Sequence, residues 1–344
     1  MRKLFALTVI FAFAMLAAAA PNEYRLLKKI AVAGDGGWDY LIVDSAARRV
    51  YVSHTNQVEV LDADSGEPVG KIAGTNGVHG IAIAPEVERG FTSNGRAGTV
   101  TIFDRKTLQI LGEVKVGKNP DAIIYEPVAR RVFAFNAESK TASVIGAADG
   151  KLLATIDLGG VPEGPVADAK GFVFVNLKDK DSDLMLRLDS KTMEIKDRWP
   201  LAAAGCTDPG NMAMDRESRR LFVRCKDRSK EAGCCVMGVI NAENGKLIAT
   251  LPIGDRVDSA AFDPATRLIF FPDGDGKVTI IHEDSPDKYS LMQNAETQPG
   301  ARTIALDLKT HRLFLPAAKS EPAEQPNGRP KILPGTFTVM MLGM

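Results

Sequence analysis

A short motif recurs seven times along this 344-residue chain. Its first copy, residues 48–54, reads Arg-Arg-Val-Tyr-Val-Ser-His, a basic pair followed by an apolar run that ends in a polar residue. The other copies begin at residues 88, 130, 170, 219, 266 and 311, so the spacings are 40, 42, 40, 49, 47 and 45 residues. A period of about 40–50 residues is typical of a four-stranded propeller blade. The seven copies therefore predict an all-β, seven-bladed β-propeller.

The units share one internal plan, which predicts four antiparallel strands in each blade. An apolar run such as residues 40–43 or 122–125 precedes the motif, and we expect it to form the innermost strand, packed on both faces. An alternating strand such as 58–61, a polar turn such as 62–66 and an outer strand such as 247–251 follow the motif. Gly and Asn at the turns favour hairpins with positive φ.

The two ends of the chain complement each other. The last unit ends with its third strand, near residues 337–342, and has no outer strand. Residues 23–32 form a strand that belongs to no unit. We predict that this N-terminal strand joins the last blade and closes the ring, because closure protects two sheet edges. The predicted propeller domain covers residues 21–344.

Three motifs carry a family resemblance. They resemble the YVTN repeat family, whose bacterial members include YncE-like exported propellers, although the last two copies, 266–272 and 311–317, have drifted furthest. The resemblance covers the chain from about residue 23 to its end, and it implies an envelope location and a binding role, with enzymatic activity in few members. The motif residues are Tyr51-Val52-Ser53-His54, Phe91-Thr92-Ser93-Asn94 and Phe133-Ala134-Phe135-Asn136.

Residues 1–20 predict a secretory signal peptide. A basic start, Met1-Arg2-Lys3, precedes an apolar stretch over residues 4–16, and small residues at 17–20 offer a cleavage site, with Ala17 and Ala19 as the A-x-A pair. We therefore expect a periplasmic or secreted monomer without a membrane span after cleavage. Lys plus Arg and Asp plus Glu both number 43, so no net charge attracts polyanions, and nucleic acid is excluded as a partner. The expected partner is a small molecule or an envelope protein.

The residues that enter the innermost strands are mostly acidic, and in a propeller these positions surround one mouth of the central channel. We predict a ligand site there, against the alternative that these charges only cap strands and contact water. His54, which ends the first motif, could approach His79 and form a metal site with the nearby Asp residues; no other cofactor is predicted. Asn94, Asn136 and Asn176 end later motifs, where we expect turn residues with left-handed φ. The predicted mouth residues are Asp39, His79, Asp121, Glu163, Asp208 beside Gly210, Asp258 and Arg302.

Two classes of function remain open. The leading hypothesis is a non-catalytic binding or scaffolding protein. The alternative is a hydrolase, such as a lactonase, that uses His79, Glu163 and Arg302 at the channel mouth, with or without a metal ion. The chain has no C-x-x-C-H haem site, no G-x-S-x-G nucleophile motif and no P-loop.

All four cysteines fall within the fifth unit. An even number of cysteines in an oxidising compartment favours disulfides. Cys206 precedes the inner strand and Cys225 ends the motif strand, so antiparallel pairing places both at the channel mouth. We predict a Cys206–Cys225 disulfide, which leaves Cys234 and Cys235 as a vicinal pair or as free thiols. The alternatives are a bridge from Cys225 to Cys234 or Cys235, and a metal–thiolate cluster.

Overall fold

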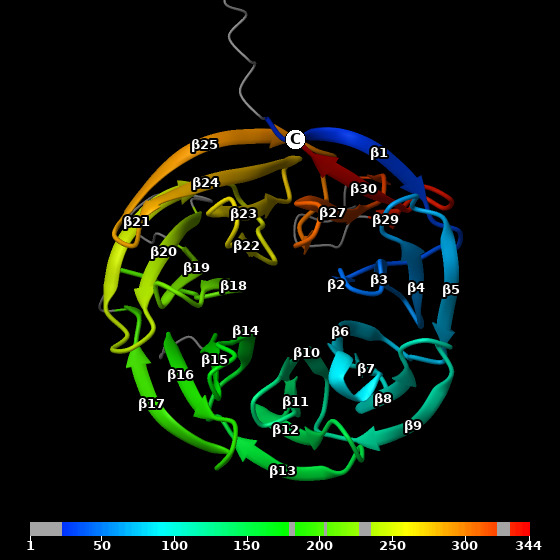
Figure 1. Cartoon of the computed structure of the whole chain (residues 1–344), viewed down its shortest axis with the longest axis horizontal. Helices are drawn as coiled ribbons and strands as arrows, with labels where there is room; N and C mark the ends of the chain where they lie inside the picture. The colour runs from blue at the N-terminus through cyan, green and yellow to red at the C-terminus, as the bar shows by residue number, and fades with distance from the viewer. Residues whose placement is uncertain (1–22, 179–182, 203–204, 227–234, 322–330) are drawn as a thin grey trace, which may run out of the picture.

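The computed structural model describes residues 23–178, 183–202, 205–226, 235–321 and 331–344. Seven four-stranded antiparallel sheets surround a central channel, so the predicted seven-bladed propeller is confirmed (Figure 1). The predicted signal peptide lies outside the described residues. In the described part of the chain, no helix is long and apolar enough to cross a membrane.

Each of the first six blades takes its four strands in sequence order, from the channel outwards. Blade 1 contains β2 (Leu41–Asp44), β3 (Arg49–His54), β4 (Gln57–Asp62) and β5 (Pro68–Ala73). Blade 2 contains β6 (Val78–Ala84), β7 (Arg89–Asn94), β8 (Thr99–Asp104) and β9 (Ile110–Lys115), with the 3₁₀ turn η1 (Pro85–Val87) after β6. Blade 3 contains β10 (Pro120–Glu126), β11 (Arg131–Asn136), β12 (Thr141–Gly146) and β13 (Leu152–Asp157). Blade 4 contains β14 (Pro162–Ala167), β15 (Phe172–Leu177), β16 (Leu184–Asp189) and β17 (Glu194–Pro200). Blade 5 contains β18 (Met212–Asp215), β19 (Arg220–Lys226), β20 (Cys235–Asn241) and β21 (Leu247–Ile253). Blade 6 contains β22 (Ala261–Asp263), β23 (Leu268–Asp273), β24 (Lys277–Ser285) and β25 (Lys288–Glu296).

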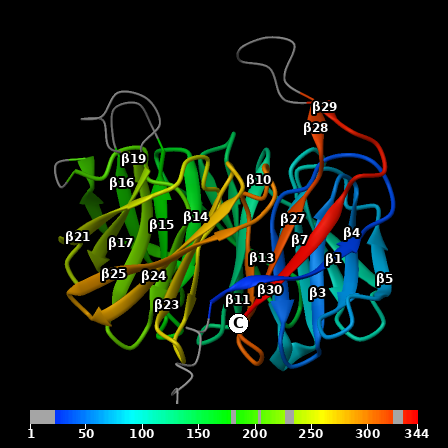
Figure 2. The same ribbon diagram turned by 90° about the horizontal axis from the view of Figure 1, so that it is seen from above.

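The seventh blade combines both ends of the chain, as predicted. Its sheet runs from β26 (Ala305–Asp307) through β27 (Arg312–Ala317) and β30 (Thr338–Gly343) to β1 (Arg25–Ala31). Strand β1 pairs antiparallel with β30, with Ile30 opposite Val339. A small hairpin, β28 (Ser320–Glu321) and β29 (Lys331–Ile332), follows β27 and stands above the face of the ring at which β27 ends (Figure 2).

The core of the molecule lies between blades. Among the described residues, seven buried apolar clusters form, and each takes side chains from two consecutive blades. Tyr51 of blade 1 packs against Phe103 of blade 2, with ring centroids 5.8 Å apart. A blade is only one sheet thick and buries its apolar faces against its neighbours. The apolar faces at the ends of the array are therefore covered only if the ring closes.

Burial differs from the expectation for the innermost strands. These strands were predicted to pack on both faces, but β2 and β22 are only partly buried. The middle strands are the fully buried ones, as in β23 and β30, where all six residues are buried. The innermost strand β18, by contrast, is buried at all four residues, so the expectation holds for β18 and not for β2 and β22.

Left-handed backbone occurs at a different place from the predicted one. Asn94, Asn136 and Asn176 are buried strand residues of β7, β11 and β15 without positive φ, so their interpretation as turn residues is wrong. The side-chain amide nitrogen of Asn94, Nδ2, donates to the hydroxyls of Thr99 and Thr101 on the next strand. Positive φ values of 52–60° occur instead one to three residues before the second strand of every blade, at Arg48, Glu88, Arg130, Ala169, Arg219, Arg267 and His311.

Candidate functional site at the channel mouth

Hydrogen bonds between neighbouring blades hold the residues that enter the innermost strands. The amide of Tyr40 in blade 1 donates to the carbonyl of His79 in blade 2 over 3.2 Å. The Ser93 hydroxyl of blade 2 donates to the carbonyl of Asp121 in blade 3. From blade 7, the Thr303 hydroxyl donates to the carbonyl of Asp39 over 2.8 Å. These bonds fix the backbone of the mouth, so the side chains project from a rigid frame.

His79 lies between two of the predicted acidic residues. Its Nδ1 is 2.6 Å from Asp39 Oδ2 and 3.8 Å from Asp121 Oδ1. Burial opposes the charged imidazolium, but the hydrogen bond to Asp39 and the charges of both carboxylates raise the pKa of His79 above its ordinary value. The prediction placed these three residues at equivalent positions of blades 1, 2 and 3, and the structure brings them into one group.

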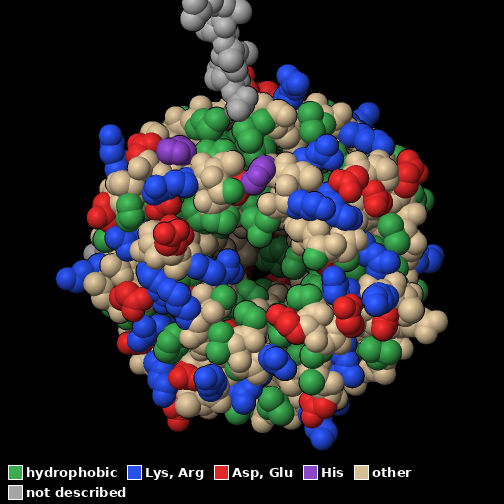
Figure 3. Space-filling view, viewed as in Figure 1, with side chains coloured by type: hydrophobic (Ala, Val, Ile, Leu, Met, Phe, Trp, Pro, Cys, Tyr) green, Lys and Arg blue, Asp and Glu red, His purple; other side chains and the backbone are tan. Residues whose placement is uncertain are grey.

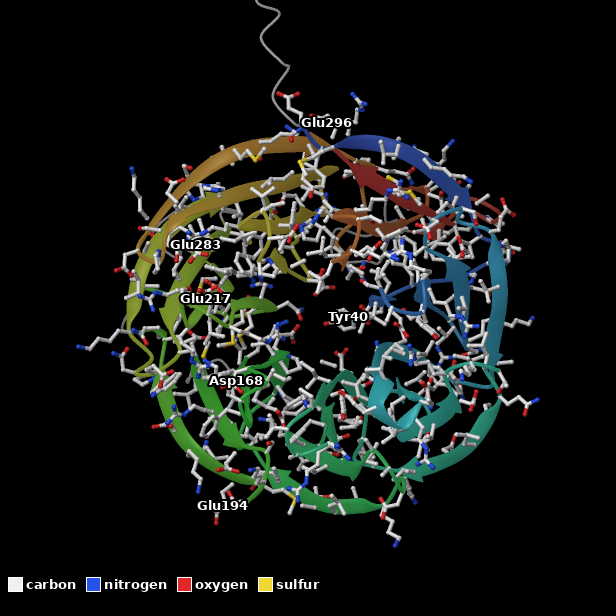
Figure 4. All side chains as sticks on the ribbon, viewed as in Figure 1. Tyr40, Asp168, Glu194, Glu217, Glu283 and Glu296 are labelled. Carbon is white, nitrogen blue, oxygen red and sulfur yellow. A yellow bond between two sulfur atoms is a disulfide. The ribbon has the colours of Figure 1, made fainter. Side chains whose placement is uncertain are left out.

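Tyr40 projects from blade 1 into the central channel (Figure 4). Asn211 of blade 5 donates from Nδ2 to the Tyr40 hydroxyl over 3.2 Å, and also to the carbonyl of Asp258 in blade 6 over 2.8 Å. Burial, followed by the negative charges of Asp121 and Asp39, raises the pKa of Tyr40 well above its ordinary value. Tyr40 is therefore a neutral phenol within a ring of carboxylates.

Two further predicted residues form an ion pair beside this group. Arg302 Nε donates to Asp258 Oδ2 over 2.8 Å. Burial lowers the pKa of the Arg302 guanidinium, but the charge of Asp258 and the hydrogen bond to it outweigh burial and raise this pKa. Burial within the channel wall raises the pKa of Asp121 to about 6 and that of Glu163 to about 7. The mouth therefore holds carboxylates that gain protons near neutral pH.

The Glu163→Gln variant is expected to gain stability over the wild type as the pH rises. The pKa of Glu163 is about 7 in the folded protein and 4.5 for the ordinary group. Between these pH values the unfolded chain loses the proton that the folded protein keeps, so this carboxyl destabilises the fold increasingly as pH rises, and fully above pH 7. Glutamine imitates the protonated form, so the melting-temperature difference between variant and wild type should increase from about pH 5 to 8.

The control for this measurement is Glu296→Gln on the outer strand β25, where the side chain is 80% exposed (Figure 4). This variant should have nearly the melting temperature of the wild type, because an exposed charge on the surface contributes little to stability. A Glu163→Gln difference that is constant with pH would contradict a raised pKa. Burial has the largest effect on the pKa of Glu163 in the folded protein. The charged groups that also act on this pKa are Lys178, Asp121, Asp258 and Arg224.

Asp208 lies apart from the acidic group around Tyr40. Its Oδ2 is 2.6 Å from Lys226 Nζ and 3.3 Å from Arg224 Nη1. Burial opposes ionisation, but the Lys226 hydrogen bond and the two positive charges lower the pKa of Asp208. The positive charges of Lys178, Arg224 and Lys226 form a basic side of the mouth at blades 4 and 5, next to the carboxylates of Asp208 and Glu163.

His54 packs between blades instead of facing the channel. It is 2% exposed, and its ring centroid lies 4.4 Å from that of Phe337 in the chain segment that enters β30. Its Nδ1 lies 3.8 Å from Glu59 Oε1. Among the described residues, the group that could hold a metal ion consists of Asp39, His79 and Asp121, without His54.

The predicted disulfide is confirmed beside the basic side of the mouth. It joins Cys206 to Cys225, and both residues are fully buried. Gly238 on β20 makes room for it, since a Cβ at this position would lie 2.9 Å from the Cys225 sulfur. Cys235 is a buried free thiol, and burial raises its pKa to about 11. Cys234 lies outside the described residues.

Sequence reasoning missed Tyr40, Asn211 and Asn119 as site residues. Tyr40 was assigned to an apolar inner strand. A signal was present, because the residue that follows the mouth position is small or medium-sized in the other six blades: Gly80, Ala122, Gly164, Asn211, Ser259 and Thr303. A single large aromatic residue among these positions is the one that reaches across the channel.

The surface around the channel has charges of both signs. Figure 3 draws the face opposite to this mouth, where the turns between the first and second strands of the blades lie; there the channel opens at the centre, and Lys and Arg side chains gather along one side of the opening. Acidic and basic residues alternate over the rest of this face. The even charge balance of the chain therefore also holds locally over most of this face.

Comparisons with known proteins identify the fold and leave the family open. No protein-family model and no curated protein matches the chain. Among solved structures, a chain of a mitotic checkpoint complex is 13% identical with a TM-score of 0.75, covering 100% of this chain and 99% of that one. Hydrazine synthase of Kuenenia stuttgartiensis is 16% identical with a TM-score of 0.69, covering 83% and 94%. The U3-55K structure is 10% identical with a TM-score of 0.72, covering 93% and 98%. At these identities the similarity shows a shared seven-bladed β-propeller fold.

Proposed function

We propose that this chain is an exported, YVTN/YncE-like propeller of the bacterial envelope that binds a small polar molecule at the mouth of its channel. The repeat motifs and the signal-like residues 1–20 support this proposal. The Cys206–Cys225 disulfide supports it too, since disulfides persist in oxidising compartments.

One observation carries the binding role: ionisable side chains from separate blades converge on Tyr40. The acidic residues Asp39, Asp121, Glu163 and Asp258 all act electrostatically on its hydroxyl. Structural ion pairs need no such convergence, whereas ligand sites typically combine an apolar or aromatic surface with a few oriented polar groups. The acidic side would hold a cationic group, and the basic side around Lys178 and Arg224 would hold an anionic group. The preferred ligand is therefore a zwitterion or a polar molecule with separated charges.

Thermal-shift screening of periplasmically produced protein tests this proposal. The panel contains amino acids, short peptides, polyamines, quaternary amines and lactones, all measured in the presence of EDTA. We expect at least one zwitterionic compound to stabilise the wild type. Glu163→Gln and Asp258→Asn should weaken its binding about tenfold or more, because each removes a charge that faces the ligand.

The matched control is Glu296→Gln, which removes the same charge far from the channel and should bind like the wild type. Stabilisation that is equal in Glu163→Gln, Asp258→Asn and the control would place the ligand elsewhere on the molecule. If no compound on the panel stabilises the wild type and native mass spectrometry finds no copurified molecule, the binding role fails. Turnover of a lactone that His79→Ala abolishes would favour the hydrolase alternative.

A further inference from the structure

We propose that Asp39, His79 and Asp121 bind one divalent transition-metal ion, such as Zn²⁺ or Mn²⁺, at the channel mouth. The proposal deepens the proposed function, on which it rests for the location of the ligand site. It names a divalent transition-metal ion as one ligand of that site.

The three side chains offer ligand atoms at suitable positions. One nitrogen of His79 and one oxygen from each aspartate lie within 4.8 Å of one another. Ligands about 2.0–2.2 Å from a Zn²⁺ ion are separated from one another by about 3–4 Å, so small side-chain rotations suffice to enclose an ion. The backbone beneath them is held by hydrogen bonds: the Asp39 amide donates to the Ser53 hydroxyl over 2.9 Å, and the Asp121 carbonyl accepts from Ser93.

The second nitrogen of His79 has the support that metal-binding histidines usually have. The side chain of Asn119 lies beside His79 Nε2. Gly95 lies beside them, and a Cβ there would be 2.5 Å from both Asn119 Oδ1 and His79 Nε2, so the glycine leaves room for this contact. A partner on Nε2 fixes the orientation of the ring and leaves Nδ1 directed toward the two carboxylates.

An independent observation concerns Asp121. Its Oδ1 has almost no solvent-accessible surface and no hydrogen-bond partner, although it lies 3.8 Å from His79 Nδ1. A buried carboxylate oxygen without a partner is costly. A metal ion between Nδ1 and the two carboxylates would satisfy this oxygen. The ion would replace the proton that joins His79 Nδ1 to Asp39, and that proton would leave to solvent.

The ligand chemistry indicates the kind of ion. One imidazole nitrogen with two carboxylates suits Zn²⁺, Mn²⁺ or Fe²⁺, whereas Ca²⁺ and Mg²⁺ prefer sites made of oxygen alone. Three protein ligands leave at least one coordination position open.

Isothermal titration of EDTA-treated, dialysed protein with ZnCl₂ and MnCl₂ tests the proposal, with CaCl₂ as the comparison. We expect one Zn²⁺ or Mn²⁺ per chain and at least tenfold weaker Ca²⁺ binding. His79→Ala and Asp121→Asn should weaken binding about 100-fold or more. Asn119→Ala should weaken it about 10- to 100-fold, the effect typical of losing the side chain that orients a metal-binding histidine. Melting curves would show that each variant is folded, and His79→Gln offers a more conservative replacement.

The chain provides a matched control in His282. Its Nδ1 lies 2.7 Å from Asp284 Oδ1, so it is also a His–Asp pair, but it lies on an exposed part of β24 and outside the metal-compatible group. His282→Ala should bind the metal like the wild type. Absence of one-to-one binding in the wild type, or unchanged binding in folded His79→Ala and His79→Gln, would overturn the proposal. Small-molecule binding that persists in EDTA would leave the proposed function standing without the metal.

Discussion

Deletion of residues 23–32 is expected to lower the free energy of unfolding by several kcal/mol, enough to unfold much of the protein at 37 °C. The segment contributes Tyr24, Ile30 and Val32 to the cores on both sides of blade 7, where they are 2%, 6% and 7% exposed. Loss of a buried aromatic side chain typically costs about 3–5 kcal/mol, and each buried aliphatic side chain adds about 1.5–3 kcal/mol. Since whole domains are stable by only about 5–15 kcal/mol, this loss is large.

Tyr24 carries much of this effect and can be tested alone. Its ring packs edge-on against Phe270 of blade 6, with centroids 5.2 Å apart, and its hydroxyl donates to the carbonyl of His311 over 2.8 Å. Its amide and carbonyl both bond the side chain of Gln293 on β25. Tyr24→Ala should therefore destabilise by about 3–5 kcal/mol, and Tyr24→Phe by about 1 kcal/mol.

Leu26→Ala is the matched control, because Leu26 lies on β1, two residues after Tyr24, and is 42% exposed. It should change the free energy of unfolding by less than about 1 kcal/mol in urea denaturation. The truncated protein should also aggregate more readily, because the edge of β30 would lose its partner. If the truncated chain and Tyr24→Ala unfold at the same urea concentration as the wild type, closure by β1 does not stabilise the ring.

Removal of the Cys206–Cys225 disulfide is expected to cost about 3 kcal/mol. The bridge spans 19 residues, and the loss of chain entropy in the unfolded state for a loop of this length corresponds to about 3 kcal/mol. The Cys206→Ala, Cys225→Ala double variant avoids leaving an unpaired polar group in the buried cluster between blades 4 and 5. Urea denaturation with and without dithiothreitol measures the effect.

The free cysteine provides the control for the disulfide. Wild type and Cys235→Ala should both lose stability in dithiothreitol, because both keep the bridge. The double variant should be insensitive to the reductant. A wild-type stability that dithiothreitol leaves unchanged, under conditions where mass spectrometry shows both thiols reduced, would contradict a stabilising role.

The sequence predicted where in the fold the site lies better than it predicted which side chains form the site. Asp39, His79 and Asp121 were expected together because equivalent positions of consecutive blades lie side by side around the channel. His54 was grouped with them, but it packs against Phe337. Successive side chains of a strand point to opposite faces, so one residue of register decides whether a strand-end residue faces the channel or the neighbouring blade. The spacing of the repeats does not give the strand register to within one residue, so it could not show which way His54 points.

The sequence by itself determined the blade count, the hairpin order within each blade, closure by residues 23–32 and the Cys206–Cys225 pair. The blade count, the hairpin order and the disulfide follow from motifs repeated every 40–49 residues or from strand neighbours within one unit. Closure follows because the last unit lacks an outer strand that residues 23–32 can supply. Only the tertiary structure decided that Tyr40 reaches Asn211, which lies 171 residues away in blade 5, and that His79 sits between two carboxylates. Contacts across the channel depend on the angle at which each blade meets the axis. That angle is set by the sizes of all the side chains packed between the blades, and no local pattern records it.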